Sequence, residues 1–195
     1  MANDLLKGKR GIIFGALNSQ SIAWKVAQRA HEEGATFVLT NAPIAMRMGE
    51  IKNLAEETGS EIIPADATSV EDLENLVTKS MEILGGKIDF VLHSIGMSPN
   101  VRKGKHYTEN DYRYYGQTMD VSAISFHKTL ATLYKHDAMS EWGSVLALSY
   151  IAAQRIFPDY NDMADAKSLL ESIARSFGYH YGIKNKVRVN TISQS

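Results

Sequence analysis

Short apolar runs alternate along this chain with longer segments of helical periodicity, and no other feature constrains the fold as strongly. The pattern predicts strands over residues 11–14, 36–40, 61–64, 89–93, 144–149 and 187–192. It predicts helices over residues 21–33, 44–58, 73–84, 112–136 and 160–182, with a loop over residues 100–111. Strands separated by helices form right-handed crossovers and a parallel sheet that is covered on both faces. We therefore expect an α/β fold, a Rossmann-type doubly wound parallel sheet in three layers.

Turn and cap residues mark the ends of several predicted helices. One apolar face of the first helix is predicted from the four-residue spacing of Ile22, Val26 and Ala30. Gly34 and Gly59 stand where glycine caps would close the first and second helices. Thr68 and Glu71 have the spacing of a capping box, which predicts the start of the third helix.

The composition limits what such a fold can do. The chain has 195 residues and 44% hydrophobic content, which suits one core and one domain over residues 1–195. Its net charge of −1 provides no basic field for nucleic acid or anionic lipid. It has no cysteine, and its six histidines show no metal-binding spacing, so we expect no disulfide and no metal. It shows neither a signal peptide nor an apolar run near the about 20 residues that span a bilayer, so we expect a cytoplasmic protein.

The first predicted strand runs into a glycine turn at Gly15, followed by a small polar loop and the start of a helix. Free backbone N–H groups and the positive end of the helix dipole at such a turn suit a pyrophosphate. The segment holds a single glycine, so the usual G-x-G-x-x-G fingerprint is absent and the turn alone is a weak signal. An ordinary strand-to-helix turn capped by Ser19 and Ser21 is the other interpretation.

Three further strand ends carry residues that suit a dinucleotide. Ala42 follows the second strand, where neither an acid for a ribose hydroxyl nor a cation for a 2′-phosphate stands, and this favours NAD over NADP. Asp66 follows the third strand, where a side chain can meet an adenine ring. Residues 94–96 follow the fourth strand and are small enough for a cofactor to approach the backbone. Because the carboxyl ends of parallel strands share one edge, these positions together favour a cofactor site.

The stretch SYIAAQRIFPDYNDMADAK, residues 149–167, holds two tyrosines and one lysine. If one helix includes Tyr160 and Lys167, their separation is nearly two turns and places both on one face. Tyr150 ends the fifth strand, so all three residues can converge on the carboxyl edge of the sheet. A nicotinamide site needs a proton donor near the substrate carbonyl and a cation near the ribose. Outside such a fold, the same residues are more often solvated surface or core side chains.

Three motifs carry a family resemblance: Gly15…Ser21-Ile22-Ala23, His93-Ser94-Ile95-Gly96 and Tyr150…Tyr160…Lys167. With these motifs, nearly the whole chain resembles the NADH-dependent enoyl-acyl carrier protein reductases of bacterial fatty acid synthesis. This family is a divergent branch of the short-chain dehydrogenase/reductases. Ordinary members place the tyrosine four residues before the lysine, and a serine thirteen residues before that tyrosine. Here those two positions hold Met163 and Tyr150, and the tyrosine lies one helical turn upstream at Tyr160.

The resemblance implies reduction of trans-2-enoyl thioesters, presented by an acyl carrier protein, to saturated acyl thioesters with NADH. It makes Tyr160 the hydrogen-bond donor to the developing enolate oxygen, Lys167 a ligand of the nicotinamide ribose, and Tyr150 a second active-site tyrosine. It also implies that Ser98 contacts the substrate and that the protein is a homotetramer. The implied cofactor contacts are Gly15, Ser21, Ile22, Ala42, Asp66, Ala67, Ser94, Ile95, Gly96 and Lys167.

The chain departs from the family pattern in three places. Ala42 stands where the best-known relatives have a glutamine near the adenosine ribose. Asp165 stands beside the usual Ala-Lys pair, which we interpret as a surface change. The chain stops at Ser195, just past the sixth strand, so we expect it to lack the family's C-terminal substrate-loop segment and last strand.

Two other functions are compatible with the same fold. The first is a non-catalytic NAD-binding regulatory domain, which has no physical need for the set of Tyr150, Tyr160 and Lys167. The second is a short-chain carbonyl reductase, and Met163 counts against it because the acid of that reaction would stand there. Activity on ketones but not on enoyl thioesters would favour the second function.

Overall fold

The computed structural model describes residues 3–47 and 50–194. Its strands are β1 (Arg10–Phe14), β2 (Thr36–Thr40), β3 (Glu61–Ile62), β4 (Ile88–His93), β5 (Met139–Tyr150) and β6 (Arg188–Gln194). Its α-helices are α1 (Ile22–Glu32), α2 (Pro43–Met46), α3 (Ile51–Thr58), α4 (Val70–Ile83), α5 (Pro99–Arg102), α6 (Tyr112–Met119), α7 (Ser125–Lys135) and α8 (Asp162–Asn185). All six predicted strands are present, but β5 begins at Met139, before its predicted start at residue 144, and β3 ends at Ile62, before its predicted end at residue 64.

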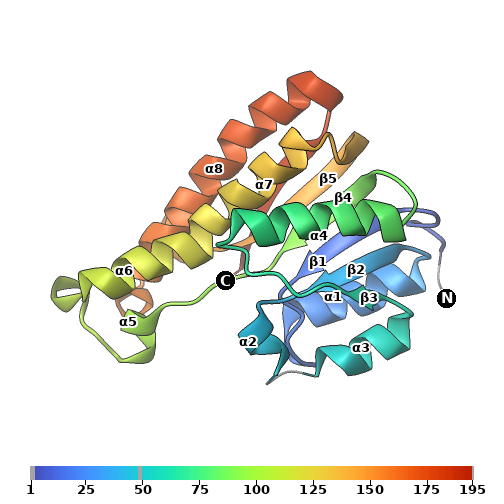
Figure 1. The fold of residues 1–195 in the computed structure, drawn as a ribbon. Coiled ribbons are helices and arrows are strands. Elements are labelled where there is room, and N and C mark those ends of the chain that lie inside the picture. The colour runs from blue at the N-terminus through green and yellow to red at the C-terminus, as the bar shows by residue number, and fades with distance from the viewer. Residues whose placement is uncertain (1–2, 48–49, 195) are drawn as a thin grey trace.

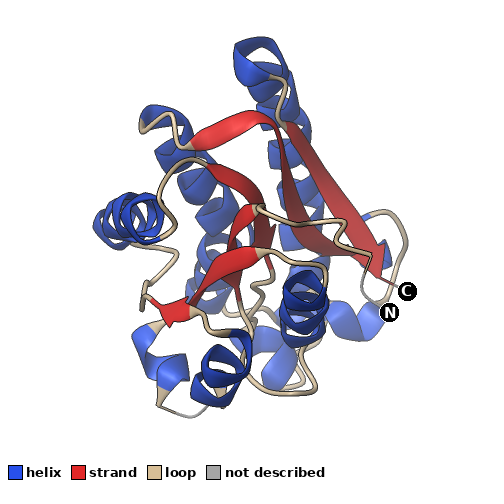
Figure 2. Cartoon of the chain, turned by 90° about the vertical axis from the view of Figure 1, so that its right-hand side faces the viewer, coloured by secondary structure: helices blue, strands red, loops and turns tan. Residues whose placement is uncertain are grey.

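The six strands form one sheet in the order β3-β2-β1-β4-β5-β6, and every neighbouring pair is parallel. Figure 2 shows these strands side by side with helices around them. The order reverses direction between β1 and β4, which is the point where ligands bind in open α/β sheets. The predicted Rossmann-type doubly wound fold is therefore confirmed.

Helices cover the sheet from two sides and form two separate cores (Figure 1). Leu73 of α4, Phe126 of α7 and Leu170 of α8 belong to one buried cluster. Trp24 of α1 and Leu54 of α3 belong to the other. The helices of the first cluster carry the segments that lead into and out of β5, so their packing determines where the residues after β5 lie.

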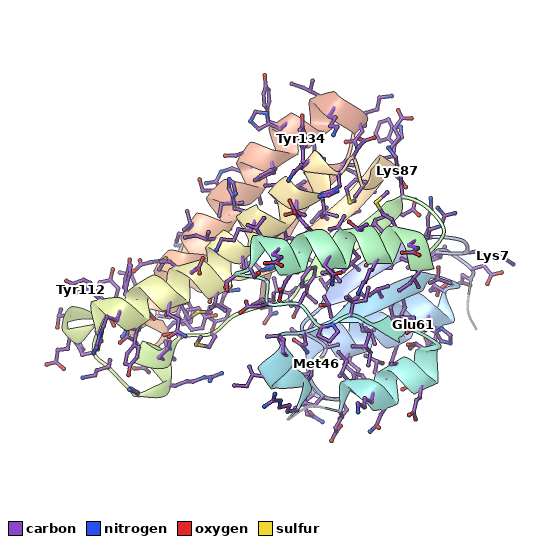
Figure 3. The ribbon with its side chains drawn as sticks, in the orientation of Figure 1. Lys7, Met46, Glu61, Lys87, Tyr112 and Tyr134 are labelled. Atoms are coloured by element: carbon purple, nitrogen blue, oxygen red, sulfur yellow. The ribbon has the colours of Figure 1, made fainter. Side chains whose placement is uncertain are left out.

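The two longest helical stretches run alongside each other (Figure 1). The helix predicted over residues 112–136 is α6 and α7 joined by a π-helical segment, Asp120–Ile124, and Figure 3 shows Tyr112 and Tyr134 near its two ends. Within that segment, Ser122 Oγ accepts from Met97 N at 3.0 Å and donates to Met97 O at 3.1 Å, which ties it to the loop after β4. Neither these helices nor any other helix in the described ranges is long and apolar enough to cross a membrane.

The buried face of α1 differs from the predicted one. Ile22 and Val26 are exposed, and the buried residues of this helix are Ala23, Trp24, Ala27 and Ala30. Three of the four are alanines, whose small side chains let the helix backbone come close to the sheet. Four-residue spacing therefore predicted the helix and the burial of Ala30 correctly, but two of the three residues of the predicted apolar face are exposed.

Several predicted helix ends also need correction. The helix predicted over residues 44–58 is two helices, α2 and α3, and residues 48–49 between them lie outside the described residues. Gly59 closes α3 with a left-handed φ of 63°, as predicted. Ser69, not Thr68, caps α4, because its Oγ accepts from Asp72 N at 3.2 Å. The predicted loop over residues 100–111 contains most of α5 and a 3-10 turn, Tyr107–Glu109.

Gly15, at the end of β1, lies directly against the loop that follows β4. Its φ is 87°, and a Cβ built on it would lie 1.9 Å from the carbonyl oxygen of Ser94. Only glycine combines this left-handed backbone with this close approach. The turn therefore holds two loops of the carboxyl edge in contact.

Replacing Gly15 by alanine should destabilise the fold by about 1–3 kcal/mol more than replacing Gly59 by alanine. Both glycines have a positive φ, so both variants carry the left-handed strain, but a Cβ on Gly59 meets nothing within 4 Å. The difference between the two variants isolates the collision with Ser94 O. Urea unfolding measures it, and equal losses would contradict the close approach.

Candidate functional site

A cavity of about 210 Å³ opens at the carboxyl ends of β4 and β5. Its walls are formed by Ser94, Ile95, Gly96, Leu148, Ser149, Tyr160, Met163, Lys167 and Gln194. Four segments that are far apart in the sequence meet here: the loop after β4, the end of β5, the start of α8 and the end of β6. Tyr160 and Lys167, predicted to converge, do share this cavity.

Lys167 is buried below the cavity floor, with 5% of its surface exposed. Its Nζ donates to Leu148 O at 2.7 Å and to Ile95 O at 3.5 Å, so it joins α8 to the ends of β5 and β4. Burial lowers the pKa of Lys167 to about 8, because the charged ammonium is poorly solvated there. An ammonium has three N–H groups, so one can serve a ligand hydroxyl in addition to the two carbonyls.

Tyr160 reaches the cavity by a different route from the predicted one. It ends a 3-10 turn, Pro158–Tyr160, and α8 begins only at Asp162, so Tyr160 and Lys167 are not two turns apart on one helix. Both nevertheless line the same cavity. Burial raises the pKa of Tyr160, and the neighbouring Tyr150 adds to the rise. The phenol therefore stays protonated at neutral pH and remains a hydrogen-bond donor.

Tyr150 ends β5, as predicted, and stacks near the other tyrosine. The ring centroids of Tyr150 and Tyr160 lie 4.5 Å apart. The ring centroid of Phe157 lies 5.4 Å from that of Tyr150. A neighbouring cavity of about 190 Å³ is lined by Tyr150, Phe157, Pro158, Asp159 and Tyr160. Tyr160 lines both this cavity and the one at Lys167, whereas Tyr150 lines only this one.

The backbone just after Tyr160 is strained. Asn161 has φ 45° and ψ −135°, a region that residues other than glycine rarely occupy and that costs about 1–3 kcal/mol. Its side chain offsets part of this cost: Oδ1 accepts from Asp162 N at 2.6 Å, and Nδ2 donates to Lys105 O at 2.6 Å. Strain of this kind persists only where the surrounding contacts hold it, and here it lies next to the tyrosine of the cavity.

A second cavity, of about 80 Å³, lies at the carboxyl ends of β1, β2 and β3. It brings together four of the predicted cofactor residues, Ala42, Asp66, Ala67 and Ile95. Asp66 Oδ1 accepts from Thr68 N at 2.9 Å and from Thr68 Oγ1 at 2.8 Å, which fixes the side chain at the turn. Ile95 lines both this cavity and the one above Lys167, so the two are neighbours along one edge.

The predicted residues of the first turn, Gly15, Ser21 and Ile22, do not line either of these two cavities. Ser21 stands at the N-cap position of α1, but its Oγ donates to Asn18 O at 2.7 Å and makes no cap bond. The side chain therefore does not compete with a ligand for the N–H groups of the first turn. Ile22 is exposed at the start of the same helix.

Ser98 does not face either cavity, which corrects its predicted contact with substrate. It is 4% exposed, and its Oγ donates to Asp162 Oδ1 at 2.6 Å. The same oxygen accepts from Val101 N at 3.0 Å, so Ser98 caps α5. Its single O–H donor is used within the fold, so Ser98 has no proton to donate to a substrate, and we withdraw it as a substrate residue.

Asp165 is not a simple surface change either. Its Oδ2 accepts from the hydroxyls of Tyr107 at 3.0 Å and Tyr115 at 3.1 Å, which joins α8 to the segment before α6 and to α6 itself. A cavity of about 450 Å³ lies beside Asp165 and shares Phe157 and Pro158 with the cavity at Tyr150. Asp165 thus helps to build the wall outside the tyrosine pair.

His93 ends β4 beneath the site and is fully packed. Its ring lies between Phe14 and Phe126, and Nε2 meets Ser125 Oγ at 3.0 Å. Burial lowers the pKa of His93 to about 3, so the ring is neutral at physiological pH. It supports the strand end and does not reach the cavity lining. In the ranges that the structure describes, no three carboxylate or imidazole side chains gather as metal ligands.

Sequence reasoning missed Asn161, Asp162 and Gln194. Asn and Asp are strong helix N-cap residues, and their position before α8 was a usable signal for where that helix begins. Gln194 lines the cavity because β6 runs two residues further than the apolar pattern predicts. No local pattern could show that Asp162 lies against Ser98, since 64 residues separate them.

Residues 15–195 match the family model described as enoyl-(acyl carrier protein) reductase. The chain belongs to the enoyl-(acyl carrier protein) reductase family. The predicted family resemblance is therefore confirmed. Membership explains the offset tyrosine in the cavity, since the resemblance rests on the spacing of Tyr150, Tyr160 and Lys167.

Named relatives within the enoyl reductase family cover nearly all of this chain. It is 36% identical over 194 residues to the NADH enoyl-acyl carrier protein reductase 1 of Rhizobium meliloti, covering 98% of this chain and 69% of the relative. Among solved structures, FabI from Alistipes finegoldii is 66% identical with a TM-score of 0.97, covering all of this chain and 74% of that one. A structure of the complex of that FabI with NADH matches with the same identity and TM-score, over 98% of this chain and 68% of that one.

Between about pH 7.5 and about pH 10, the wild-type chain should gain stability relative to a Lys167→Met variant. The pKa of Lys167 is about 8 when folded and 10.5 in its ordinary state, so the unfolded chain binds more protons in this interval. Stability then rises with pH. The difference in unfolding free energy should grow by about 2 kcal/mol, at about 1.4 kcal/mol per pKa unit. Urea unfolding of both proteins at both pH values measures it. If the difference in unfolding free energy between wild type and variant does not change with pH, burial does not lower the pKa of Lys167.

Proposed function

We propose that this chain reduces the carbon–carbon double bond of trans-2-enoyl thioesters with NADH and releases saturated acyl thioesters. Membership in the family makes it an NADH-dependent oxidoreductase of fatty acid synthesis. The observation that carries the residue assignment is the single cavity shared by Tyr160 and Lys167, with the Tyr150 ring stacked beside it. The name of the Rhizobium relative and the NADH complex of the Alistipes FabI support the cofactor.

The residues along the carboxyl edge fit NADH. The cavity at Ala42 and the cavity at Lys167 share Ile95, so one elongated ligand can lie across both. No cation stands at Ala42 to pair with a 2′-phosphate, which favours NADH over NADPH. We assign the adenosine end to Ala42, Asp66 and Ala67, the pyrophosphate to the turn of Gly15, Ser21 and Ile22, and the nicotinamide end to Ser94, Ile95, Gly96 and Lys167.

Two side chains would do the chemical work at the substrate. When bound, NADH supplies the hydride that the β-carbon of the enoyl group accepts. Tyr160 donates a hydrogen bond to the thioester oxygen, where negative charge develops, and a donor placed in advance is a large catalytic contribution. Lys167 holds the nicotinamide ribose hydroxyls and adds positive charge nearby. Tyr150 lines the acyl side of the site. A proton delivered through water to the α-carbon then converts the enolate into the saturated acyl thioester.

The partner, the assembly and the location are proposed from the family resemblance. We propose that an acyl carrier protein presents the substrate, and that residues 1–195 act as one dinucleotide-binding and catalytic domain. We further propose that the protein is a cytoplasmic homotetramer in which α6, α7 and α8 form one interface. Exposed apolar side chains on these helices, Ile124 after α6 and Leu169 in α8, suit such an interface.

Replacing Tyr160 by phenylalanine should lower kcat roughly 10²-fold, because one donor to the developing oxyanion is lost. The affinity for NADH should change little, since the phenol is assigned to the substrate. The decay of NADH absorbance with a short trans-2-enoyl-CoA measures the rate. Tyr179→Phe is the matched control, because Tyr179 is exposed on the same helix, α8. Equal rates in both variants would remove Tyr160 from the mechanism, and turnover of ketones alone would favour a carbonyl reductase.

Replacing Lys167 by alanine should weaken NADH binding by about 10- to 100-fold, the range expected for loss of one charged hydrogen-bonding group. Titration of NADH fluorescence gives the dissociation constant without any turnover. Lys184→Ala serves as the control, since Lys184 lies in the last turn of α8 and pairs with Asp137. An unchanged dissociation constant for the Lys167 variant would contradict the assigned ribose contact.

A further inference from the structure

Asp162, the first residue of α8, is completely buried and has no cation among its hydrogen-bond partners in the described structure. Three neutral donors satisfy it instead. Oδ1 accepts from Ser98 Oγ at 2.6 Å, and Oδ2 accepts from Asn100 Nδ2 at 2.8 Å and Thr118 Oγ1 at 2.9 Å. A carboxylate at a helix N-terminus also interacts favourably with the helix dipole.

The three donors come from segments that build the outer wall of the site. Ser98 caps α5, in the segment that follows the cavity-lining residues 94–96. Asn100 also holds the main chain of Asp111, donating to its carbonyl and accepting from its N–H, both at 3.2 Å. Thr118 lies in the last turn of α6. One carboxylate therefore anchors the start of α8 to the whole region between β4 and the π-helical segment.

Only Asn161 separates Asp162 from Tyr160, and its backbone is the strained one. The 3-10 turn that ends at Tyr160 cannot continue into α8, because Asn161 breaks the helical path with φ 45° and ψ −135°. Asp162 holds the helix side of this break and Asn161 Nδ2 holds the turn through Lys105 O. Asp162 is the residue nearest to the break on the helix side, so the loss of its hydrogen bonds should let the break relax and Tyr160 move with it.

We propose that Asp162 is a positioning residue for the enoyl reductase reaction: its buried hydrogen bonds to Ser98, Asn100 and Thr118 hold the Tyr160 hydroxyl at the substrate oxygen. This inference rests on the proposed function. Asp162 touches neither cavity, so it acts only through the orientation of Tyr160. Replacing Asp162 should therefore lower kcat only when the Tyr160 hydroxyl is present.

A double-mutant cycle tests this dependence in the full chain. Asp162→Ala should lower kcat at least about ten-fold and change the NADH dissociation constant less than about two-fold. In the Tyr160→Phe background, Asp162→Ala should cause almost no further loss, because the hydroxyl that it positions is already gone. A general loss of structure would instead multiply the two effects, and that result would overturn the proposal.

A milder pair of variants keeps the test valid if Asp162→Ala does not fold. Thr118 Oγ1 lies 2.9 Å from Asp162 Oδ2 and 2.9 Å from Tyr114 O within α6. Thr118→Val removes this donor and keeps the shape of the side chain, so it should lower kcat about two- to five-fold. Thr129→Val is the matched control, because Thr129 is equally buried and its hydroxyl donates only to Ser125 O within α7. Equal kcat values for Thr118→Val and Thr129→Val would overturn the proposal.

A spectroscopic measurement gives a readout that needs no turnover. In protein with ¹³C-labelled tyrosine, the Tyr160 ring resonance is the one missing from Tyr160→Phe, and its shift reports the Tyr150 ring 4.5 Å away. The resonance should move in Thr118→Val and stay in place in Thr129→Val. Full activity of Asp162→Ala beside an impaired Tyr160→Phe would overturn this inference alone. Absence of NADH oxidation by the wild type would overturn the proposed function with it.

Discussion

The parallel pairing of β1 with β4 is the constraint on which the rest of the site depends. It reverses the direction of winding, and it places the loops after both strands at the same edge of the sheet. Gly15 shows how tight this arrangement is, because its backbone lies against the carbonyl of Ser94 and leaves no room for a side chain. The loop after β4 then reaches both cavities through Ile95. A long ligand can lie along this edge because the loop after β4 borders both cavities.

The eight residues from Tyr160 to Lys167 concentrate features that are unfavourable by themselves. Asn161 is strained, Asp162 is a buried carboxylate without a cation among its partners, and Lys167 is a buried amine with a lowered pKa. Natural proteins accept such local costs mainly at functional sites. The rest of α8 offsets them, since Leu170 is fully buried and Tyr181 donates to Leu130 O at 2.8 Å. The helix is anchored in the core so that its first turns can carry the site.

The wall outside the tyrosine pair is held by acidic side chains of α8. Asp162 binds the segment around α5 and the end of α6, and Asp165 binds the hydroxyls of Tyr107 and Tyr115. Desolvation, followed by the charge and hydrogen bond of Asp165, raises the pKa of Tyr115 to about 12. These phenols therefore remain donors throughout the physiological range. Both carboxylates tie α8 to the polypeptide between β4 and α7, which gives the cavity a rigid side.

The sequence by itself determined the order of strands and helices, the family, and the identity of Tyr150, Tyr160 and Lys167. The order of the elements follows from periodicity, a local property of the chain, and the family and the three residues follow from the motifs that carry the resemblance. The tertiary structure decided what lies between distant segments. In the folded chain, Tyr160 lies outside the helix because Asn161 breaks the helical path. The hydroxyl of Ser98, predicted to contact the substrate, donates to Asp162 instead. Such pairings depend on which loops meet at the carboxyl edge, and only packing in three dimensions brings residues 64 positions apart into hydrogen-bonding distance.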